Sequence, residues 1–143
     1  MKSEAVIDDS MLKIRLSTLW IVVMFNMVFA DIYSIIVELV NGNTFNIPGE
    51  VTTMMAIAAI VTNIPIFMIF LSRTLSRKAN RVTNIITAPL TILYVIRGGH
   101  LAPHYLISAA IEVVILVYIF ITVLKWKKLW MENLKKTDLI EER

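Results

Sequence analysis

Two carboxyl groups lie inside apolar runs long enough to cross a membrane, and they are the residues best able to do chemistry. Asp31 interrupts LSTLWIVVMFNMVFADIYSIIVELV, which runs from Leu16 to Val40, and Glu112 interrupts an apolar run that starts near Tyr105. An ionised group in hydrocarbon surroundings costs free energy. We therefore expect each carboxylate either to have a charged or hydrogen-bonding partner or to serve a function. We expect both to belong to one polar site within the membrane.

The two acids are expected at a similar depth. On a helix that begins at Leu16, Asp31 lies about 22 Å along the axis, roughly 8 Å short of the far boundary of a core about 30 Å thick. Glu112 lies about 10 Å into a helix that returns from that side. Arg97 precedes this return, and its side chain can reach either an acid or the lipid head groups. One cation facing two carboxylates leaves a net negative charge. A shared proton or a bound cation could neutralise this charge, or water could solvate it.

Three further residues complete the predicted binding site. His100 can titrate near neutral pH, and a histidine beside a buried carboxylate suits proton transfer. Asn63 and Tyr94 lie on polar stripes that follow helical spacing. The alternative is structural: polar side chains can serve interhelical packing, His100 can sit in a wet loop, and tyrosines can form an interfacial belt.

Catalytic and metal-binding motifs are absent from the sequence. The chain has no cysteine, which excludes disulfides, thiolate chemistry and cysteine-ligated metals. His100 and His104 have the spacing of half a ligand pair, but Pro103 lies between them and no third clear ligand follows. Glycine-rich phosphate loops, nucleophile elbows and HExxH are also missing. We therefore expect no metal and no cofactor. A non-enzymatic role is favoured over an enzymatic one.

Composition predicts the elements that must position these residues. Of the 143 residues, 57% are hydrophobic and 17% are charged, far from the average of soluble domains. The sequence therefore predicts one all-α domain over residues 1–143, an antiparallel four-helix transmembrane bundle. The expected helices cover residues 16–40, 51–71, 82–96 and 105–124, followed by a basic tail over 125–143.

The third expected helix is the shortest. Fifteen residues rise about 22 Å, against a hydrocarbon core of about 30 Å, and Pro89 lies in their middle. This segment must recruit polar flanks, thin the bilayer locally, or dip into the membrane without crossing it.

Basic residues predict the orientation. They gather before the first helix, between the second and third, and in the tail, and Arg97 is the only one of the 14 lysines and arginines outside these segments. Because cytoplasmic loops are enriched in lysine and arginine, both termini are expected in the cytoplasm of a multi-pass protein of the cell (inner) membrane. The basic flanks, with Trp126 and Trp130 among the lysines of the tail, should contact the anionic inner leaflet. Basic charge confined to membrane flanks also argues against nucleic-acid binding.

An acidic first span, a basic middle loop, the IRGGHLAPHY junction and a fourth span with Glu112 follow one another in this chain. In this order the sequence resembles small four-span bacterial membrane proteins of uncharacterised function and is distantly similar to the DoxX-like group. The resemblance covers most of the chain from Lys13 to Trp126. It implies a four-helix bundle in a cell membrane and carries over no active residue.

Three functional hypotheses remain open. The first is binding or transport of a proton, a cation or a small polar head group in an outward-facing pocket lined by Asp31, Arg97 and Glu112. The second is an accessory role in which polar stripes hold together a homo-oligomer or a partner membrane subunit. The third is an intramembrane enzyme that uses His100 and Glu112 in acid-base chemistry on a lipid-soluble substrate.

Overall fold

The chain folds into four helices. The computed structural model describes residues 2–42, 51–98 and 101–141, and every regular element in these ranges is helical. The elements are α1 (Lys2–Val40), α2 (Val51–Thr74), α3 (Arg77–Arg97) and α4 (Pro103–Glu141). The predicted all-α class is confirmed.

Each helix contains the segment predicted for it and extends beyond that segment. α1 begins at Lys2 and α4 continues to Glu141, so both helices run past their apolar stretches. α3 begins at Arg77 rather than near Val82, and its 21 residues span about 31 Å. An apolar run marks only the part of a helix that suits hydrocarbon, whereas backbone hydrogen bonding continues through the polar flanks.

Three of the helices contain a stretch that is long and apolar enough to cross a membrane. Within the described ranges these stretches are Asp9–Val40, Met55–Thr74 and Pro103–Trp126. They are the helices of a membrane protein. α3 differs because it carries polar residues at helical spacing along its buried face. The buried residues of α3 are Asn80, Asn84, Thr87, Ala88, Thr91 and Val95.

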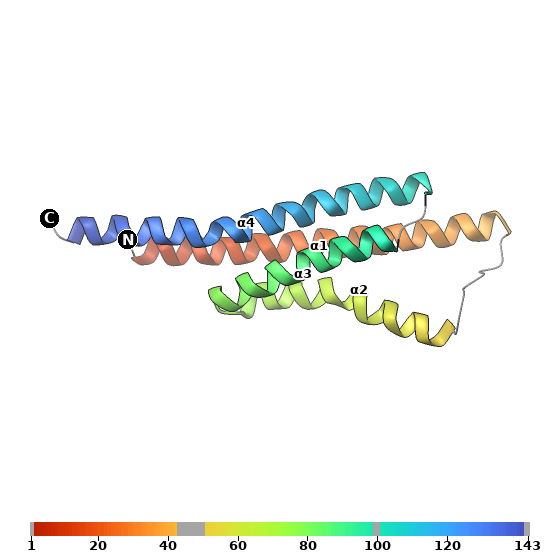
Figure 1. Cartoon of the computed structure of the whole chain (residues 1–143), viewed down its shortest axis with the longest axis horizontal. Helices are drawn as coiled ribbons and strands as arrows, with labels where there is room; N and C mark the ends of the chain where they lie inside the picture. Colours follow the sequence, from red (N-terminus) through yellow and green to blue (C-terminus); the bar gives the residue numbers. More distant parts are fainter. Residues whose placement is uncertain (1, 43–50, 99–100, 142–143) are drawn as a thin grey trace.

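α1 occupies a central position in the arrangement. It packs against α2 and against α4, while α3 packs against α4 and contacts α2 only briefly. Figure 1 shows α1 and α4 side by side, with the first residues of α1 and the last residues of α4 at the same end. The beginning of α2, near Val51, diverges from α1. Side chains of α1 can therefore reach two different interfaces.

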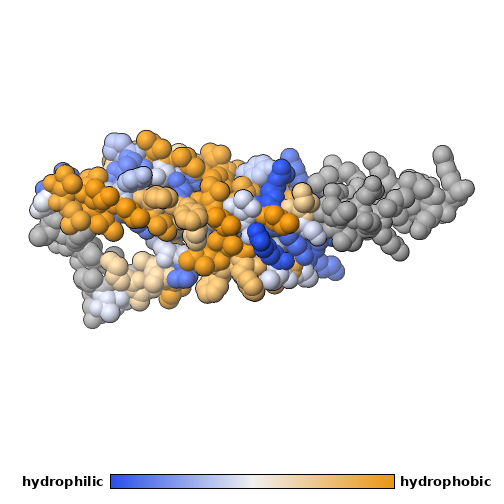
Figure 2. Space-filling model, turned by 180° about the vertical axis from the view of Figure 1, so that it is seen from behind, coloured by the Kyte–Doolittle hydropathy of each residue, from blue (hydrophilic) through white to orange (hydrophobic). Residues whose placement is uncertain are grey.

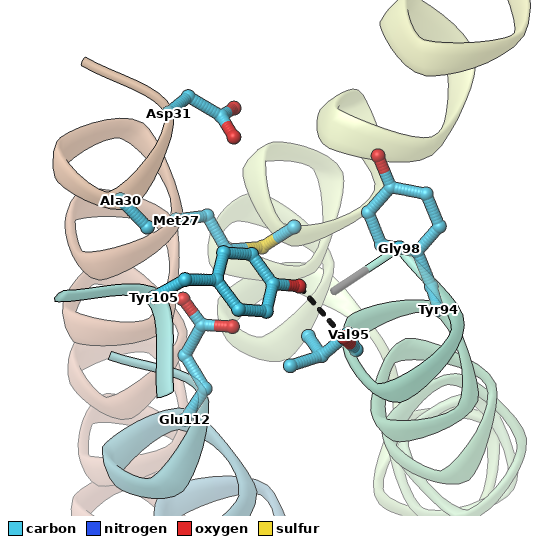
Figure 3. A pocket seen from close by; sticks show the side chains of 8 residues that line it. All are labelled: Met27, Ala30, Asp31, Tyr94, Val95, Gly98, Tyr105 and Glu112. Atoms are coloured by element: carbon cyan, nitrogen blue, oxygen red, sulfur yellow. Dashed lines mark hydrogen bonds between the residues drawn. The ribbon is translucent and has the colours of Figure 1, made fainter. Parts of the chain in front are cut away.

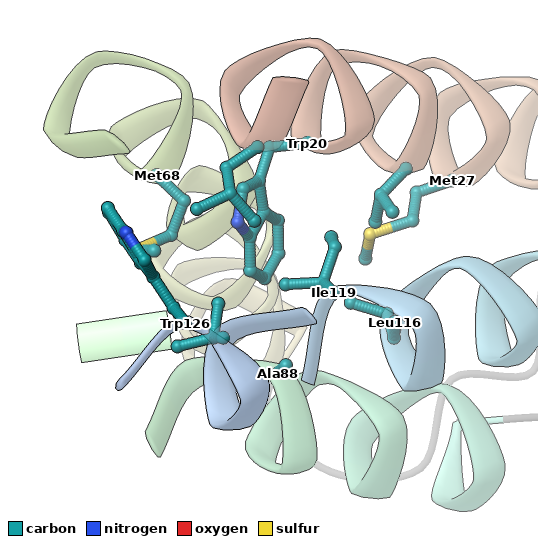
Figure 4. Close-up of a cluster of buried hydrophobic side chains, with 10 residues drawn as sticks. Trp20, Met27, Met68, Ala88, Leu116, Ile119 and Trp126 are labelled. Atoms are coloured by element: carbon teal, nitrogen blue, oxygen red, sulfur yellow. The ribbon is translucent and has the colours of Figure 1, made fainter. Parts of the chain in front are cut away.

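The hydrophobic core lies mainly between α1 and α4. Its side chains recur every three or four residues on each helix, which forms one apolar stripe per helix. Met68 of α2 and Ala88 of α3 complete it (Figure 4). The buried residues of the two long helices are Leu16, Trp20, Val23 and Met27 in α1, and Leu116, Ile119, Val123 and Trp126 in α4.

The outer surface is largely apolar. Figure 2 shows hydrophobic side chains over most of the described part of one face, with hydrophilic side chains gathered toward the end where α4 finishes. Ile60 is 70% exposed and Phe70 is 65% exposed, so large apolar side chains point outward. Apolar surface of this extent suits contact with lipid. Exposed basic residues include Arg15, Arg73, Lys78 and Lys125.

Candidate polar pocket

A small pocket with a volume of about 60 Å³ lies where α1, α3 and α4 meet. Two carboxyl groups and two tyrosines line it, and in Figure 3 the ring of Tyr105 lies between Asp31 and Glu112, with Tyr94 on the α3 side. The lining residues are Met27, Ala30, Asp31, Tyr94, Val95, Gly98, Tyr105 and Glu112.

Glu112 is the buried acid of the pocket. Its residue surface is only 3% exposed, because α4 turns this side chain toward α1. The Asn26 side-chain amide donates to Glu112 Oε1 at 3.0 Å and to the Ser108 carbonyl at 2.8 Å. One amide of α1 therefore holds both the carboxyl group and the backbone of α4. The hydrogen bonds fix which way Glu112 points.

Asp31 is the more exposed of the two acids that line the pocket. It is exposed at the edge of the pocket, four residues beyond Met27 on the same helical face. In the described part of the chain no hydrogen bond or ion pair joins Asp31 to another side chain. The carboxyl group is therefore available to a molecule that enters the pocket.

Tyr105 joins the beginning of α4 to the end of α3. Its hydroxyl donates to the Val95 carbonyl at 2.7 Å. That carbonyl belongs to the last turn of α3, where backbone acceptors lack partners within the helix. Gly98 follows closely, and a Cβ there would lie 3.2 Å from the Tyr94 carbonyl and 3.9 Å from the Tyr105 hydroxyl. This end of the pocket is tightly packed.

A further polar contact lies nearer the C-terminal end of α1. The Ser34 hydroxyl and His104 Nε2 are 3.2 Å apart, and the same hydroxyl donates to the Ala30 carbonyl at 2.9 Å. His104 thus joins the first turn of α4 to α1. It does not line the pocket in the described part of the chain.

The structure brings together three of the six predicted site residues: Asp31, Tyr94 and Glu112 line one pocket. Arg97 is exposed at the end of α3, and within the described residues it neither lines the pocket nor forms an ion pair with either acid. Asn63 is exposed on α2 and donates to the Ala59 carbonyl of its own helix at 2.7 Å. His100 lies outside the described residues.

Asn26 was not predicted from the sequence. A signal for it existed, because it is an uncharged polar residue in an otherwise apolar run and a side chain there needs a hydrogen-bond partner. Its partner could not be named, since that depends on how α1 and α4 are rotated toward each other.

A second buried polar network joins α1, α2 and α3 away from the pocket. Trp20 Nε1 donates to Asn84 Oδ1 at 2.7 Å, and Asn84 Nδ2 donates to Asn80 Oδ1 at 2.6 Å. Asn80 Nδ2 in turn donates to the Ser72 carbonyl at 2.6 Å. Trp20, Asn80 and Asn84 are fully buried. This chain of hydrogen bonds fixes α3 against its neighbours.

Two ion pairs of the described residues lie near the basic end of the molecule. Arg77 Nε is 2.6 Å from Asp9 Oδ1, and Lys13 Nζ is 3.7 Å from Asp9 Oδ2. Arg73 Nε donates to the Ser17 hydroxyl at 3.0 Å. Within the described residues there is no group of three or more histidine, aspartate or glutamate side chains able to hold a metal ion.

The fold and the pocket define a small all-α membrane protein with a cavity lined by acids. Residues 7–133 match the model of a family of unknown function (DUF6326), and the chain belongs to that family. No curated protein and no solved structure matches the chain.

Proposed function

We propose that the chain is a four-span protein of the cell membrane, an antiparallel bundle with both termini in the cytoplasm, that binds a small monovalent cation in the polar pocket. The length of α3, about 31 Å, supports a fourth crossing of a core about 30 Å thick. Polar residues of α3 can be accommodated there because they are buried against other helices.

The direction in which the pocket opens follows from the basic residues. Asp31, Gly98 and Tyr105 lie toward the end of α1, the end of α3 and the beginning of α4. The exposed basic residues lie toward the other end of the molecule: Arg15 in the N-terminal half of α1, Arg73 in the last turn of α2 and Lys78 in the first turn of α3. With the basic end in the cytoplasm, the pocket opens toward the outer side of the membrane.

One observation carries the proposal: two carboxyl groups line the same cavity, and no lysine or arginine lines it in the described part of the chain. A cation bound in the cavity that both carboxylates line offsets their mutual repulsion. Tyr94 and Tyr105 add aromatic faces, which attract cations. A volume of about 60 Å³ leaves room for one small cation, because a single water needs only about 10–15 Å³ of such space. A proton competes for the same carboxylates.

Thermal unfolding in lipid nanodiscs tests the proposal. A cation that binds the folded protein raises the unfolding temperature with concentration, by mass action. We expect methylammonium chloride to stabilise the wild type above the effect of an equal concentration of tetraethylammonium chloride, whose cation is too large for the pocket. Asp31→Asn and Glu112→Gln should each lose this difference, while Gln still offers Asn26 an oxygen to bond.

The control is Glu38→Gln, which removes one acid from α1 at a half-buried position that does not line the pocket. It should keep the methylammonium effect. Loss of the effect in Glu38→Gln as well, or its persistence in both pocket variants, would overturn the proposed cation site. The accessory role would then be the better hypothesis, and the resemblance to the DoxX-like group adds no residue that favours either.

A further inference from the structure

A second, larger cavity adjoins the polar pocket. It is a groove between α1 and α2 with a volume of about 280 Å³. Apolar side chains dominate it, among them Met24, Val28 and Ile32 of α1 and Ile66 of α2. Methionine is flexible and polarizable, and it adapts to irregular ligands.

Met27 and Asp31 line both cavities. They lie one turn apart on α1, the helix that packs against α2 on one side and α4 on the other. A molecule that places a charged group in the pocket lined by Asp31 and Glu112 can therefore extend an apolar part past Asp31 into the groove. The combined site is polar in the pocket and apolar along the groove.

We infer that the pocket and the groove together bind a single-chain primary alkylammonium ion, with its ammonium group at Asp31 and Glu112 and its hydrocarbon chain between α1 and α2. The inference rests on the proposed cation binding and names the ligand class. Two acids without a basic partner among the lining residues favour a positive head group. An ammonium group also donates three hydrogen bonds, which carboxylates accept.

The volumes define the size of each part of the ligand. A pocket of about 60 Å³ admits an ammonium group, whereas a trimethylammonium group is larger by three methyl carbons and has no N–H to donate to the carboxylates. An apolar cavity of roughly 150 Å³ accepts benzene, so the groove of about 280 Å³ has room for a chain of about eight to twelve carbons.

Charge separates this ligand from the ordinary lipids of a membrane. A phosphoethanolamine head group carries a phosphate anion close to its ammonium, and that anion would approach the two acids. A fatty alcohol has the same chain but no charge to attract them. The site should therefore prefer a free long-chain amine to both.

Photolabelling in phosphatidylcholine nanodiscs tests the inference. The probe is decylamine with a diazirine in the middle of its chain, and labelled peptides are identified by mass spectrometry. We expect label on α1 between Met24 and Ile35 and on α2 near Thr62 and Ile66. Decylamine should compete at least about tenfold better than decyltrimethylammonium or decanol.

A pair of tryptophan variants supplies the matched control. Ile66→Trp fills the groove, whereas Ile60→Trp adds the same side chain to an exposed position of α2 outside it. Ile66→Trp should lose at least about nine tenths of the labelling, and Ile60→Trp should keep it. Both should retain the methylammonium effect on thermal unfolding, because the polar pocket is untouched.

The outcomes separate the two proposals. If methylammonium stabilises the protein but decylamine competes no better than decanol, the chain site is wrong and the cation site stands. Label that is spread over all outward-facing helix surfaces would mean that the probe partitions into the bilayer without a preference for the groove, which also overturns the inference. If neither amine acts through Asp31 and Glu112, both proposals fail.

Discussion

At the scale of single residues, the pocket depends on how one buried carboxyl group is held. Asn26 reaches from α1 to two atoms of α4, Glu112 Oε1 and the Ser108 carbonyl. A buried polar atom that loses its partner costs more free energy than the hydrogen bond itself contributes. Asn26 therefore both stabilises the α1–α4 interface and orients the Glu112 carboxyl group.

We expect Asn26→Ala to lower the free energy of unfolding by about 1–3 kcal/mol, because it removes the side-chain donor to the buried Glu112 carboxyl group. Unfolding by SDS in mixed micelles measures this loss. Asn63→Ala is the matched control, since Asn63 is exposed and bonds only to the backbone of its own helix among the described residues. Equal losses in the two variants would contradict the assigned role of Asn26.

Sequence reasoning reached Asp31, Glu112 and Tyr94 because polar side chains stand out in apolar runs. It could not place Arg97, whose direction is set by the rotation of α3. Val95 is buried, and a residue two positions later lies about 200° around the helix. Arg97 accordingly faces away from the buried side. That rotation is decided by tertiary packing, which no residue spacing reports.

At the scale of elements, α3 is held by polar contacts as much as by apolar ones. Its buried face presents Asn80 and Asn84, and the latter accepts the indole N–H of Trp20 from α1. An indole N–H buried without an acceptor is costly, so each partner depends on the other. The network positions the helix that carries Tyr94 into the pocket.

A double-mutant cycle on Trp20→Phe and Asn84→Ala measures this dependence. Each single variant should destabilise the protein, and the double variant should lose less than the sum by about 1 kcal/mol, because the shared hydrogen bond is lost only once. The readout is again unfolding by SDS. Additive losses would mean that the 2.7 Å contact contributes nothing to stability.

The elements themselves were largely predictable. All four expected segments lie inside helices, because apolar runs and the breakers between them are local properties of the sequence. The bounds given to the apolar runs do not include the polar flanks, through which α1, α3 and α4 continue as helices. The groove beside Asp31 was not predicted. It arises where α1 and α2 face each other, and pairwise packing is invisible in a hydropathy pattern.

At the scale of the whole molecule, the membrane topology depends on whether α3 crosses the bilayer. Three helices contain an apolar stretch of membrane length in the described part of the chain, and α3 does not. If α3 crosses as well, its two ends lie on opposite sides of the membrane. If it does not cross, Ser76 before it and Ala102 after it lie on the same side. The proposed outward-facing pocket requires the first arrangement.

Single cysteines can distinguish the two arrangements, because the chain has no native cysteine. Ser76→Cys suits one end, since Ser76 is exposed and its side chain makes no capping hydrogen bond to α3. Ala102→Cys suits the other, in the turn before α4. In intact cells an impermeant maleimide should label Ala102→Cys, and it should label Ser76→Cys only after permeabilisation. Labelling of both from outside, or of neither, would mean that α3 does not cross, and the four-span arrangement would have to be abandoned.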